Sequence, residues 1–328
     1  DPGIDHMSAM KTIHQVESRG GRIKGFISYC GGLPAPEANT NPYGYKFSWS
    51  PRGVLLAGKN SAQFLWQGKE TLIAAKELFE KYITLDVEGL GKFEAYPNRN
   101  SLPYIELYGV KSTETMLRGT LRNTGWCPTL KKLIDVGWLE DKPVPGLKSK
   151  RFCDLTAALA QGTAWSAPPP ASSAKDARDR TAKAVGLAGG SDILTRIEWL
   201  GLFSESPLPL ETGSPLDIIE KVMLEKLQYA EGERDMIILR HEFHAAYPDG
   251  KEEKIVATLI DFGVPGGDSA MARTVGLPAA MGVKMVLEGR LRDTGVVIPL
   301  APHIYRPILA ELEKCYAIHF TEKVIPVK

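Results

Sequence analysis

The sequence predicts an α/β protein of α+β character with a mixed β-sheet, rather than a barrel. Segments with helical and strand periodicity are mixed along the chain and do not alternate regularly. The turn signal Pro248-Asp249-Gly250 separates two apolar runs, which indicates an antiparallel strand pair. Between about 123 and 209 the sequence pattern changes to helical segments joined by loops rich in small residues and proline, which predicts a separate helical subdomain.

The first elements follow from local signals. Apolar residues at Ile4, Met7, Met10 and Ile13 predict a helix with Asp1-Pro2 at its start, and Gly20-Gly21 ends it. Residues 22–30 have the β-branched and aromatic content of a strand, and the Gly-, Pro- and Asn-rich segment 31–45 predicts a loop. Further on we expect a helix over 61–79 that overlaps strand-like pieces, at 72–74, 84–87 and 91–96.

The second half of the chain contains clearer signals for where helices begin and end. Ser214-Pro215 starts a helix with one apolar stripe, and Ser269 caps another that runs to Gly289 with an interruption near Gly276-Leu277-Pro278. The remaining predictions are a linker or exposed loop, a buried helix end with Trp199 and Leu200, two strands and a final helix, at 166–175, 194–203, 236–239, 254–260 and 307–315.

Composition excludes several classes of function. Lys and Arg number 40 against 39 Asp and Glu, so no basic field favours nucleic acid or an anionic membrane. No run of about 18 apolar residues predicts a membrane span. Four cysteines lie far apart, which is typical of a reducing, intracellular compartment. The start at Asp1 without Met leads us to expect a piece of a longer protein.

Two groups of residues resemble ligand motifs without fitting them. The glycine-rich segments 186–190 and 263–267 do not match GxGxxG after a strand, so we predict turns and no complete dinucleotide site. His241 and His244 are three apart on a predicted strand and therefore face opposite sides, which argues against a shared metal ion. We predict no metal site.

Three side chains remain as candidates for binding or chemistry. Cys30 ends a strand, where a thiol is a nucleophile, a pocket wall or simply a small buried residue. Without a partner histidine we favour the pocket wall. Arg99 and Arg122 lie where strands end, and guanidinium groups bind carboxylates through paired hydrogen bonds. A structural ion pair is the alternative for each arginine.

Long motifs in a fixed order resemble one family. They are Asp1-Pro2-Gly3-Ile4-Asp5-His6, Ser28-Tyr29-Cys30-Gly31-Gly32-Leu33-Pro34-Ala35-Pro36-Glu37, Tyr45-Lys46-Phe47-Ser48-Trp49-Ser50, Tyr96-Pro97-Asn98-Arg99, Arg118-Gly119-Thr120-Leu121-Arg122, Glu233-Arg234-Asp235-Met236 and Ser269-Ala270-Met271-Ala272-Arg273-Thr274-Val275-Gly276. This series, which covers essentially the whole chain, resembles the glutamate-forming, NADP-dependent saccharopine dehydrogenases. The matching half of bifunctional aminoadipic semialdehyde synthase belongs to the same group.

The resemblance implies a mixed-sheet substrate-binding and dimerisation domain with an inserted α-helical domain. It also implies that most of an N-terminal Rossmann domain precedes this chain. The implied division is the end of the nucleotide-binding domain, the first part of the sheet domain, the helical insertion, the second part of the sheet domain, and helices that return to the nucleotide domain, at 1–20, 21–122, 123–212, 213–266 and 267–328.

The resemblance further implies an oxidoreductase that interconverts saccharopine with L-glutamate and 2-aminoadipate semialdehyde, using NADP(H), on the lysine pathway. Imine formation and hydride transfer would be the chemistry. We expect a homodimer in the cytoplasm or the mitochondrion, with no nucleic-acid or membrane partner. Two alternatives stay open: a catalytically inactive dimeric binding module as isolated, or a related carboxynorspermidine or homospermidine type of enzyme.

Site residues carried over from the family complete the expectations. Arg99, Thr120, Leu121 and Arg122 would bind substrate carboxylates, and Cys30 would line the reacting centre. The cofactor side would be formed by Asp1, Pro2, Gly3, Trp49 and Ser50. Asp1 and Cys30 are the catalytic candidates. Two positions depart from the family pattern, because Asn100 replaces the usual Asp and Asn123 replaces the usual Tyr.

Overall fold

The computed structural model describes residues 3–162 and 170–327. In these ranges the strands are β1 (Arg22–Pro34), β2 (Ala62–Trp66), β3 (Lys69–Ile73), β4 (Ile83–Val87), β5 (Gly91–Pro97), β6 (Thr115–Asn123), β7 (Asp235–Ala246), β8 (Glu252–Phe262) and β9 (Thr321–Val327). The α-helices are α1 (Ile4–Ser18), α2 (Pro51–Leu56), α3 (Pro103–Leu107), α4 (Trp126–Val136), α5 (Phe152–Ala160), α6 (Ala174–Ala184), α7 (Asp192–Leu200), α8 (Pro215–Lys226), α9 (Ala270–Leu287) and α10 (Pro302–Tyr316).

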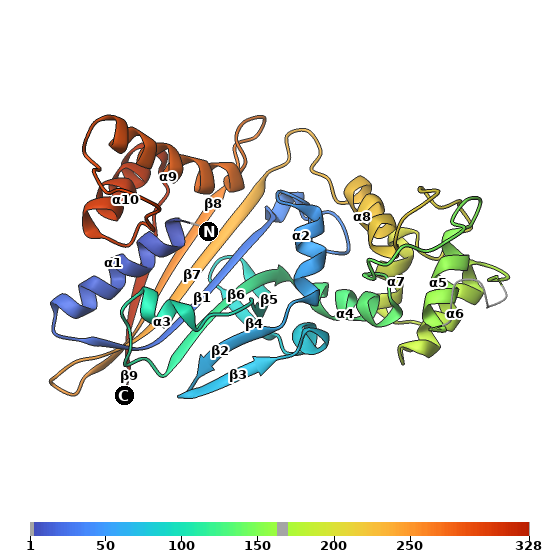
Figure 1. The fold of residues 1–328 in the computed structure, drawn as a ribbon, viewed down its shortest axis with the longest axis horizontal. Helices are drawn as coiled ribbons and strands as arrows, with labels where there is room; N and C mark the ends of the chain where they lie inside the picture. Colours follow the sequence, from blue (N-terminus) through green and yellow to red (C-terminus); the bar gives the residue numbers. More distant parts are fainter. Residues whose placement is uncertain (1–2, 163–169, 328) are drawn as a thin grey trace.

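The strands described here form one mixed sheet in the order β3-β2-β6-β1-β7-β8-β9 (Figure 1). β1 pairs in parallel with β6 and antiparallel with β7. The first half of β6 is bordered by β2 and the second half by β5, which in turn pairs with β4. The parallel pair β1 and β6 therefore lies in the middle of the sheet, where both strands end on the same edge.

The sheet has two apolar cores. On one face, Phe26, Met116 and Phe243 pack with helices α1, α9 and α10. On the other, Tyr29 and Leu121 belong to a core that continues into the helical part of the chain. Alternate residues of β1 and β6 serve different cores, as the two-residue period of a strand requires.

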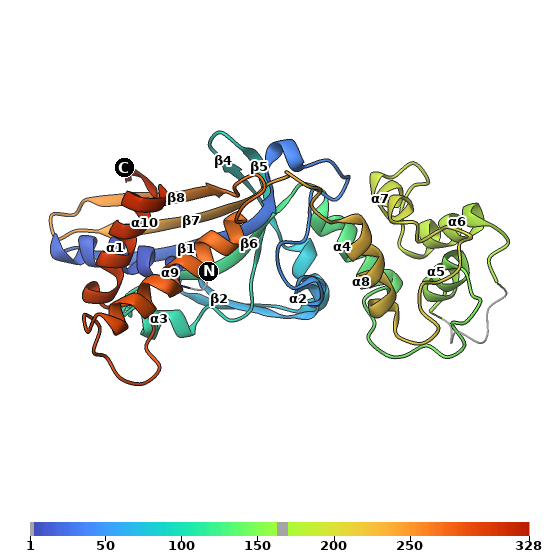
Figure 2. The ribbon, with the colours of Figure 1, turned by 90° about the horizontal axis from the view of Figure 1, so that it is seen from above.

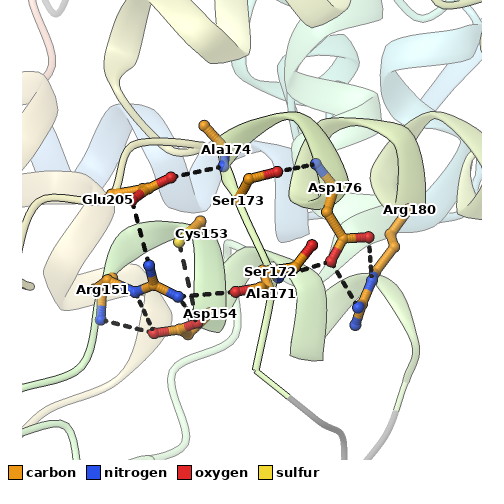
Figure 3. Close-up of polar contacts among 10 residues, drawn as sticks. All are labelled: Arg151, Cys153, Asp154, Ala171, Ser172, Ser173, Ala174, Asp176, Arg180 and Glu205. Atoms are coloured by element: carbon orange, nitrogen blue, oxygen red, sulfur yellow. Dashed lines mark hydrogen bonds and ion pairs between the residues drawn. The ribbon is translucent and has the colours of Figure 1, made fainter.

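Helices α5, α6 and α7 gather at the far end of the molecule from α1, α9 and α10 in both views (Figures 1 and 2). Figure 3 shows the polar contacts that join α5 to the start of α6. Arg151 donates two hydrogen bonds to Asp154, at 3.0 and 2.9 Å, and one to the carbonyl of Ala171 at 2.8 Å. Asp176 accepts from Arg180 and from the Ser172 amide. These contacts hold the chain that leads into α6 against α5.

Several local predictions are confirmed. Helix α1 ends at Ser18, just before Gly20, whose φ is +76°. Ser214 caps α8 through its hydroxyl, which accepts from the Asp217 amide at 3.1 Å. β7 and β8 pair antiparallel across the predicted turn, where Gly250 has φ +82°. Both glycine-rich segments, 186–190 and 263–267, lie in turns and irregular chain.

Other predictions are wrong, each for a physical reason. The expected helix over 61–79 is a β2–β3 hairpin followed by a 3-10 helix (Ala75–Glu80). Gln67 and Gly68 both have positive φ, at +49° and +78°, which matches the turn that a right-twisted hairpin needs. The predicted loop 31–45 begins too early, since β1 continues to Pro34 through its pairing with β7.

Three more boundaries differ from expectation. The N-cap of α1 is Gly3 rather than Asp1, and the Gly3 amide donates to Asp5 Oδ1 at 2.8 Å. Helix α9 runs through Pro278 without interruption, because the buried stripe of Thr274, Pro278 and Met281 continues across it. Strand β9 was not predicted; all of its residues are exposed, so it lacks the buried alternation by which a strand is found.

Among the described residues, α9 is the one helix long and apolar enough to cross a membrane, judged by length and composition alone. Its stripe of buried residues packs against the sheet, which is equally typical of a helix that covers a core.

Candidate functional site

A cavity of about 160 Å³ lies at the carboxyl ends of the parallel strands β1 and β6. Cys30 and Thr120 are register partners on these strands and both line it. The carboxyl ends of parallel strands are a common place for ligands in open sheets. The other lining residues come from β1, the following loop, α2, the residue after β5, β6, β7 and α9: Gly32, Tyr45, Trp49, Val54, Asn98, Gly119, Arg122, Ile237, Met271, Thr274 and Val275.

The alternation of β6 decides which predicted residues reach the cavity. Thr120 and Arg122 lie on the face that lines it. Leu121 lies on the opposite face and is fully buried in the other core. Gly31 must be glycine for this packing, since a Cβ there would lie 2.8 Å from Leu121 Cβ and 3.0 Å from its carbonyl oxygen. Only the backbone of Leu121 can therefore contact a ligand in the cavity.

Arg122 is the unusual charge of the site. Its side chain is only 7% exposed, yet no carboxylate in the described part of the chain lies within ion-pair distance of it. Nη1 donates to the Leu121 carbonyl at 2.8 Å, and Nε has no hydrogen-bond partner among those residues. The guanidinium carbon lies 5.0 Å from the Tyr45 ring centre and 5.6 Å from that of Trp126. Two aromatic rings thus hold a buried cation that has no carboxylate partner among the described residues.

The Cys30 thiol is half-buried in the wall of the cavity. Burial raises the pKa of Cys30 above its ordinary 9.0, so the thiol stays protonated near neutral pH. A protonated thiol is a poor nucleophile. This environment suits the pocket-wall role, and no histidine among the lining residues is placed to activate the sulfur.

A buried polar network adjoins the cavity on the same face of β6. Arg118 Nη2 donates to Asp5 Oδ2 at 2.9 Å, and Arg118 also contacts the Tyr104 hydroxyl. Asp5 is 2% exposed and accepts from the Gly3 amide as well. One carboxylate thus ties the start of α1 to β6, two residues before Thr120. Burial acts to raise the pKa of Asp5, whereas the charges of His6 and Arg118 and the hydrogen bond from the Gly3 amide all act to lower it.

The predicted cofactor-side residues are only partly brought together. Trp49 lines the cavity with 55% of its side chain exposed. Ser50 instead caps α2, accepting from the Gly53 amide at 3.3 Å, and it is not among the lining residues. Gly3 begins α1. Asp1 and Pro2 lie outside the described residues.

Arg99 is exposed and does not line the cavity, whereas its neighbour Asn98 does. The backbone of Arg99 has φ +53°, a strained conformation for a residue other than glycine. It is held by β2, because the Gln63 amide donates to the Arg99 carbonyl at 2.8 Å. Strain of this kind is often found at functional sites.

The two departures from the family pattern have local roles. Asn100 Oδ1 accepts from the Leu102 amide at 2.9 Å, so its side chain bonds backbone rather than Arg99. Asn123 Nδ2 donates to the Gly44 carbonyl at 2.7 Å. Asn123 is absent from the cavity lining, where the neighbouring Tyr45 supplies the aromatic wall.

The contribution of α9 was missed by sequence reasoning. Met271, Thr274 and Val275 of its first turns line the cavity. Ser269 and Asp235 hold this end of the helix, since Asp235 accepts from the Ala270 and Met271 amides at 2.6 and 2.9 Å. The helix N-terminus therefore already has its anion. The motif Ser269–Gly276 was visible in the sequence, but only the packing of α9 on β7 brings it to the cavity.

The predicted orientation of the histidines is observed. His241 is buried and its Nε2 lies 2.8 Å from Ser8 Oγ, while His244 bonds Glu252 at 2.6 Å on the other face. Within the described ranges no group of three His, Cys, Asp or Glu is placed to hold a metal ion.

Comparisons with known proteins agree on one family. The family model described as saccharopine dehydrogenase C-terminal domain matches residues 1–318. The glutamate-forming, NADP(+) saccharopine dehydrogenases of Pyricularia oryzae and Saccharomyces cerevisiae are 42% and 40% identical to this chain, over 99% of the chain and 72% of each relative. Alpha-aminoadipic semialdehyde synthase, mitochondrial, of Bos taurus is 36% identical over 99% of this chain and 35% of that protein.

A solved structure is similar over the same span. Apo histidine-tagged saccharopine dehydrogenase (L-Glu forming) from Saccharomyces cerevisiae matches with a TM-score of 0.89 at 38% identity. The match covers 99% of this chain and 72% of that one.

Proposed function

This chain belongs to the saccharopine dehydrogenase C-terminal domain family, and we propose that it supplies the substrate-binding part of an NADP-dependent saccharopine dehydrogenase. The reaction would interconvert saccharopine with L-glutamate and 2-aminoadipate semialdehyde in lysine metabolism. Its relatives that are named for this activity match the chain from end to end. The mixed sheet and its similarity to a solved saccharopine dehydrogenase support the same assignment.

The observation that carries the proposal is the buried Arg122. A desolvated guanidinium without a carboxylate is costly, and a ligand carboxylate would remove that cost. Tyr45 and Trp126 hold the guanidinium in place before the ligand arrives. Saccharopine and both of its products are amino acids with carboxylates, so each of them offers the missing partner.

The cavity is smaller than a site that encloses a whole ligand, for which about 300 Å³ or more is usual. We infer that one carboxylate end enters beside Arg122 and Thr120 while the rest passes the mouth near Asn98. There the exposed Arg99 is placed to bind a second carboxylate after a change of side-chain rotamer. Leu121 would contribute backbone contacts.

For NADP(H), the chain offers one edge of a site. The half-exposed indole of Trp49 at the cavity mouth presents a flat apolar surface that fits a nicotinamide ring. Gly3 and the preceding Asp1-Pro2, with Ser50, are proposed to complete that edge. When bound, the nicotinamide supplies or accepts hydride. Cys30 would then form a neutral wall at the reacting centre, and Asp1 is retained as an acid–base candidate.

We propose the domain division of the family for this chain, with 1–20 and 267–328 facing a nucleotide-binding domain. Exposed apolar residues support that surface, because Val283, Val286 and Leu287 of α9 are followed by the exposed segment Val296–Ile298. By itself the chain would lack most of the dinucleotide site and would be inactive. We further propose a homodimer located in the cytoplasm or the mitochondrion.

Calorimetric titration with saccharopine tests the function. Arg122→Gln should weaken binding by about 1.5–3 kcal/mol, roughly tenfold or more. Arg52→Gln is the matched control, since Arg52 pairs with Asp217 and Glu220 away from the cavity. If the full-length protein with NADPH neither binds nor turns over saccharopine, the proposal is wrong.

A further inference from the structure

The two aromatic rings beside the Arg122 guanidinium depend on groups outside the cavity for their own positions. The Trp126 side chain is 1% exposed, and its indole Nε1 has no hydrogen-bond partner among the described residues. Its ring centre lies 4.7 Å from that of Tyr45, and both rings contact the guanidinium. Because the indole makes no hydrogen bond there, the place of Trp126 is set by packing and by the backbone that carries it.

The buried side chain of Glu94 fixes that backbone on both sides of Trp126. Its Oε1 accepts from the Gly125 amide and its Oε2 from the Cys127 amide, each at 2.7 Å. Glu94 is only 3% exposed, and hydrogen bonds to an ionised carboxylate are stronger than those between neutral groups. These amides belong to the start of α4, where a helix leaves its first N–H groups without partners. Trp126 therefore stands between two anchored residues.

Glu94 is also the cross-strand neighbour of Arg122. The two residues are register partners on β5 and β6. Opposite charges directly across an antiparallel pair normally attract each other. Here both oxygens of Glu94 are engaged by α4, and the described part of the chain shows no ion pair between Glu94 and Arg122. The nearest carboxylate across the sheet is thus kept from occupying the guanidinium.

The second ring is held by Asn123, the residue after Arg122. Asn123 Nδ2 donates to the Gly44 carbonyl at 2.7 Å, directly before Tyr45. Glycine permits this close approach, because a Cβ on Gly44 would lie 2.5 Å from Asn123 Cβ. Neither Glu94 nor Asn123 lines the cavity. Each of them acts on the site through the backbone next to one ring.

We propose that Glu94 and Asn123 are positioning residues for Arg122, Glu94 through Trp126 and Asn123 through Tyr45. The inference rests on the proposed function and adds to it two residues outside the cavity. Rings that are held in place fix the guanidinium before a ligand arrives, so less freedom is lost when a carboxylate binds. Loss of either anchor should therefore weaken binding only while Arg122 is present.

The test is a double-mutant cycle in the full-length enzyme, with saccharopine as the ligand and calorimetry as the measurement. Glu94→Gln keeps the shape of the side chain but replaces one acceptor oxygen with a donor. Glu94→Gln and Asn123→Ala should each raise the Kd about fivefold. In an Arg122→Gln background each should change the Kd by less than about twofold. Asp154→Asn is the matched control, because Asp154 accepts from the Arg151 amide at 3.3 Å at the start of α5, away from the cavity.

Each outcome decides for or against the inference. A loss of affinity that disappears in the Arg122→Gln background, with no such loss in Asp154→Asn, supports it. Equal losses in both backgrounds would show a general weakening of the fold, and unchanged binding would show that the rings need no anchor; both results overturn it. Tighter binding by Glu94→Gln would show that the charge of Glu94 opposes the ligand, which overturns the role given to Glu94. A wild-type enzyme that does not bind saccharopine contradicts the proposed function, and the inference falls with it.

Discussion

Arg122 places binding and stability in opposition at a single residue. The guanidinium is almost completely buried, and the described residues give it aromatic contacts and one carbonyl but no carboxylate. Apolar side chains of similar size often stabilise a protein when they replace an uncompensated buried charge. The arginine is therefore best explained by what it binds.

Replacing Arg122 with methionine should have opposite effects on the two properties. We expect the free energy of unfolding to rise by about 1 kcal/mol, because a desolvated charge is removed. Saccharopine binding should be lost in the same variant. Urea denaturation and calorimetry measure these changes. A marked fall in stability would show that the guanidinium has a structural partner instead.

His241 gives stability a pH dependence on the acid side. Burial lowers the pKa of His241 from its ordinary 6.5 to about 4 in the folded protein. Between these values the unfolded chain binds a proton that the native state does not. The stability linked to His241 is therefore fully present above pH 6.5. It is lost as the pH falls toward 4, by about 1.4 kcal/mol for each unit.

This linkage is checked by comparing unfolding free energies at pH 7 and pH 5. The difference between the two pH values should be smaller in His241→Gln than in wild type. His303→Gln, at an exposed histidine that bonds Asp293, is the control and should behave as wild type. Equal pH dependence in all three proteins would show that His241 titrates normally.

At the scale of elements, one buried ion pair positions α1 against β6. Asp5 binds the Gly3 amide and Arg118, which lies on β6 two residues before Thr120. The N-terminal end of α1 is therefore fixed against β6. Tyr104 of α3 adds a further contact to Arg118.

Asp5→Asn should destabilise the fold by about 3 kcal/mol, because it removes the carboxylate that pairs with Arg118 in a mostly buried place. Urea denaturation measures the loss. In the double variant Asp5→Asn with Arg118→Met, part of the stability should return, since the buried guanidinium is removed together with its carboxylate. If the two single losses simply add, the residues do not act as a pair.

At the scale of the whole molecule, one face of the sheet lacks helices over much of its area. Two cavities of about 630 and 510 Å³ hollow this face, on β1, β7, β8 and β9. Trp66, Ile260, Ile325 and Val327 are exposed there or at its margin. Apolar residues gathered on one surface commonly mark a protein interface. A twofold pairing of this face is the geometry that we expect for the proposed homodimer.

Charges on that face should disrupt the dimer. Ile325→Glu combined with Trp66→Lys should weaken self-association at least tenfold, because each variant leaves an unpaired charge at the interface. Sedimentation velocity over a range of concentrations measures the change. Leu224→Glu, on α8 at the helical end, is the control. A wild-type protein that sediments as a monomer at high concentration would contradict the assignment.

The elements that the sequence predicted well have their signals within a few residues. Ser214 and Ser269 cap helices by accepting hydrogen bonds from amides close to them in the chain. Gly250 adopts the positive φ that its turn requires. The helix expected over 61–79 failed because Gln67 adopts a positive φ that only the paired hairpin stabilises.

The sequence by itself determined the mixed α and β character, several helix and turn boundaries, and the motifs that point to the family. Tertiary structure alone decided that Cys30 and Thr120 stand side by side, that Leu121 turns away from the cavity, and that Met271 closes it. The physical reason is the distance along the chain over which each signal acts. Caps and turns depend on neighbours along the chain, whereas strand register and the burial of a charge depend on surfaces that meet only when the whole chain folds.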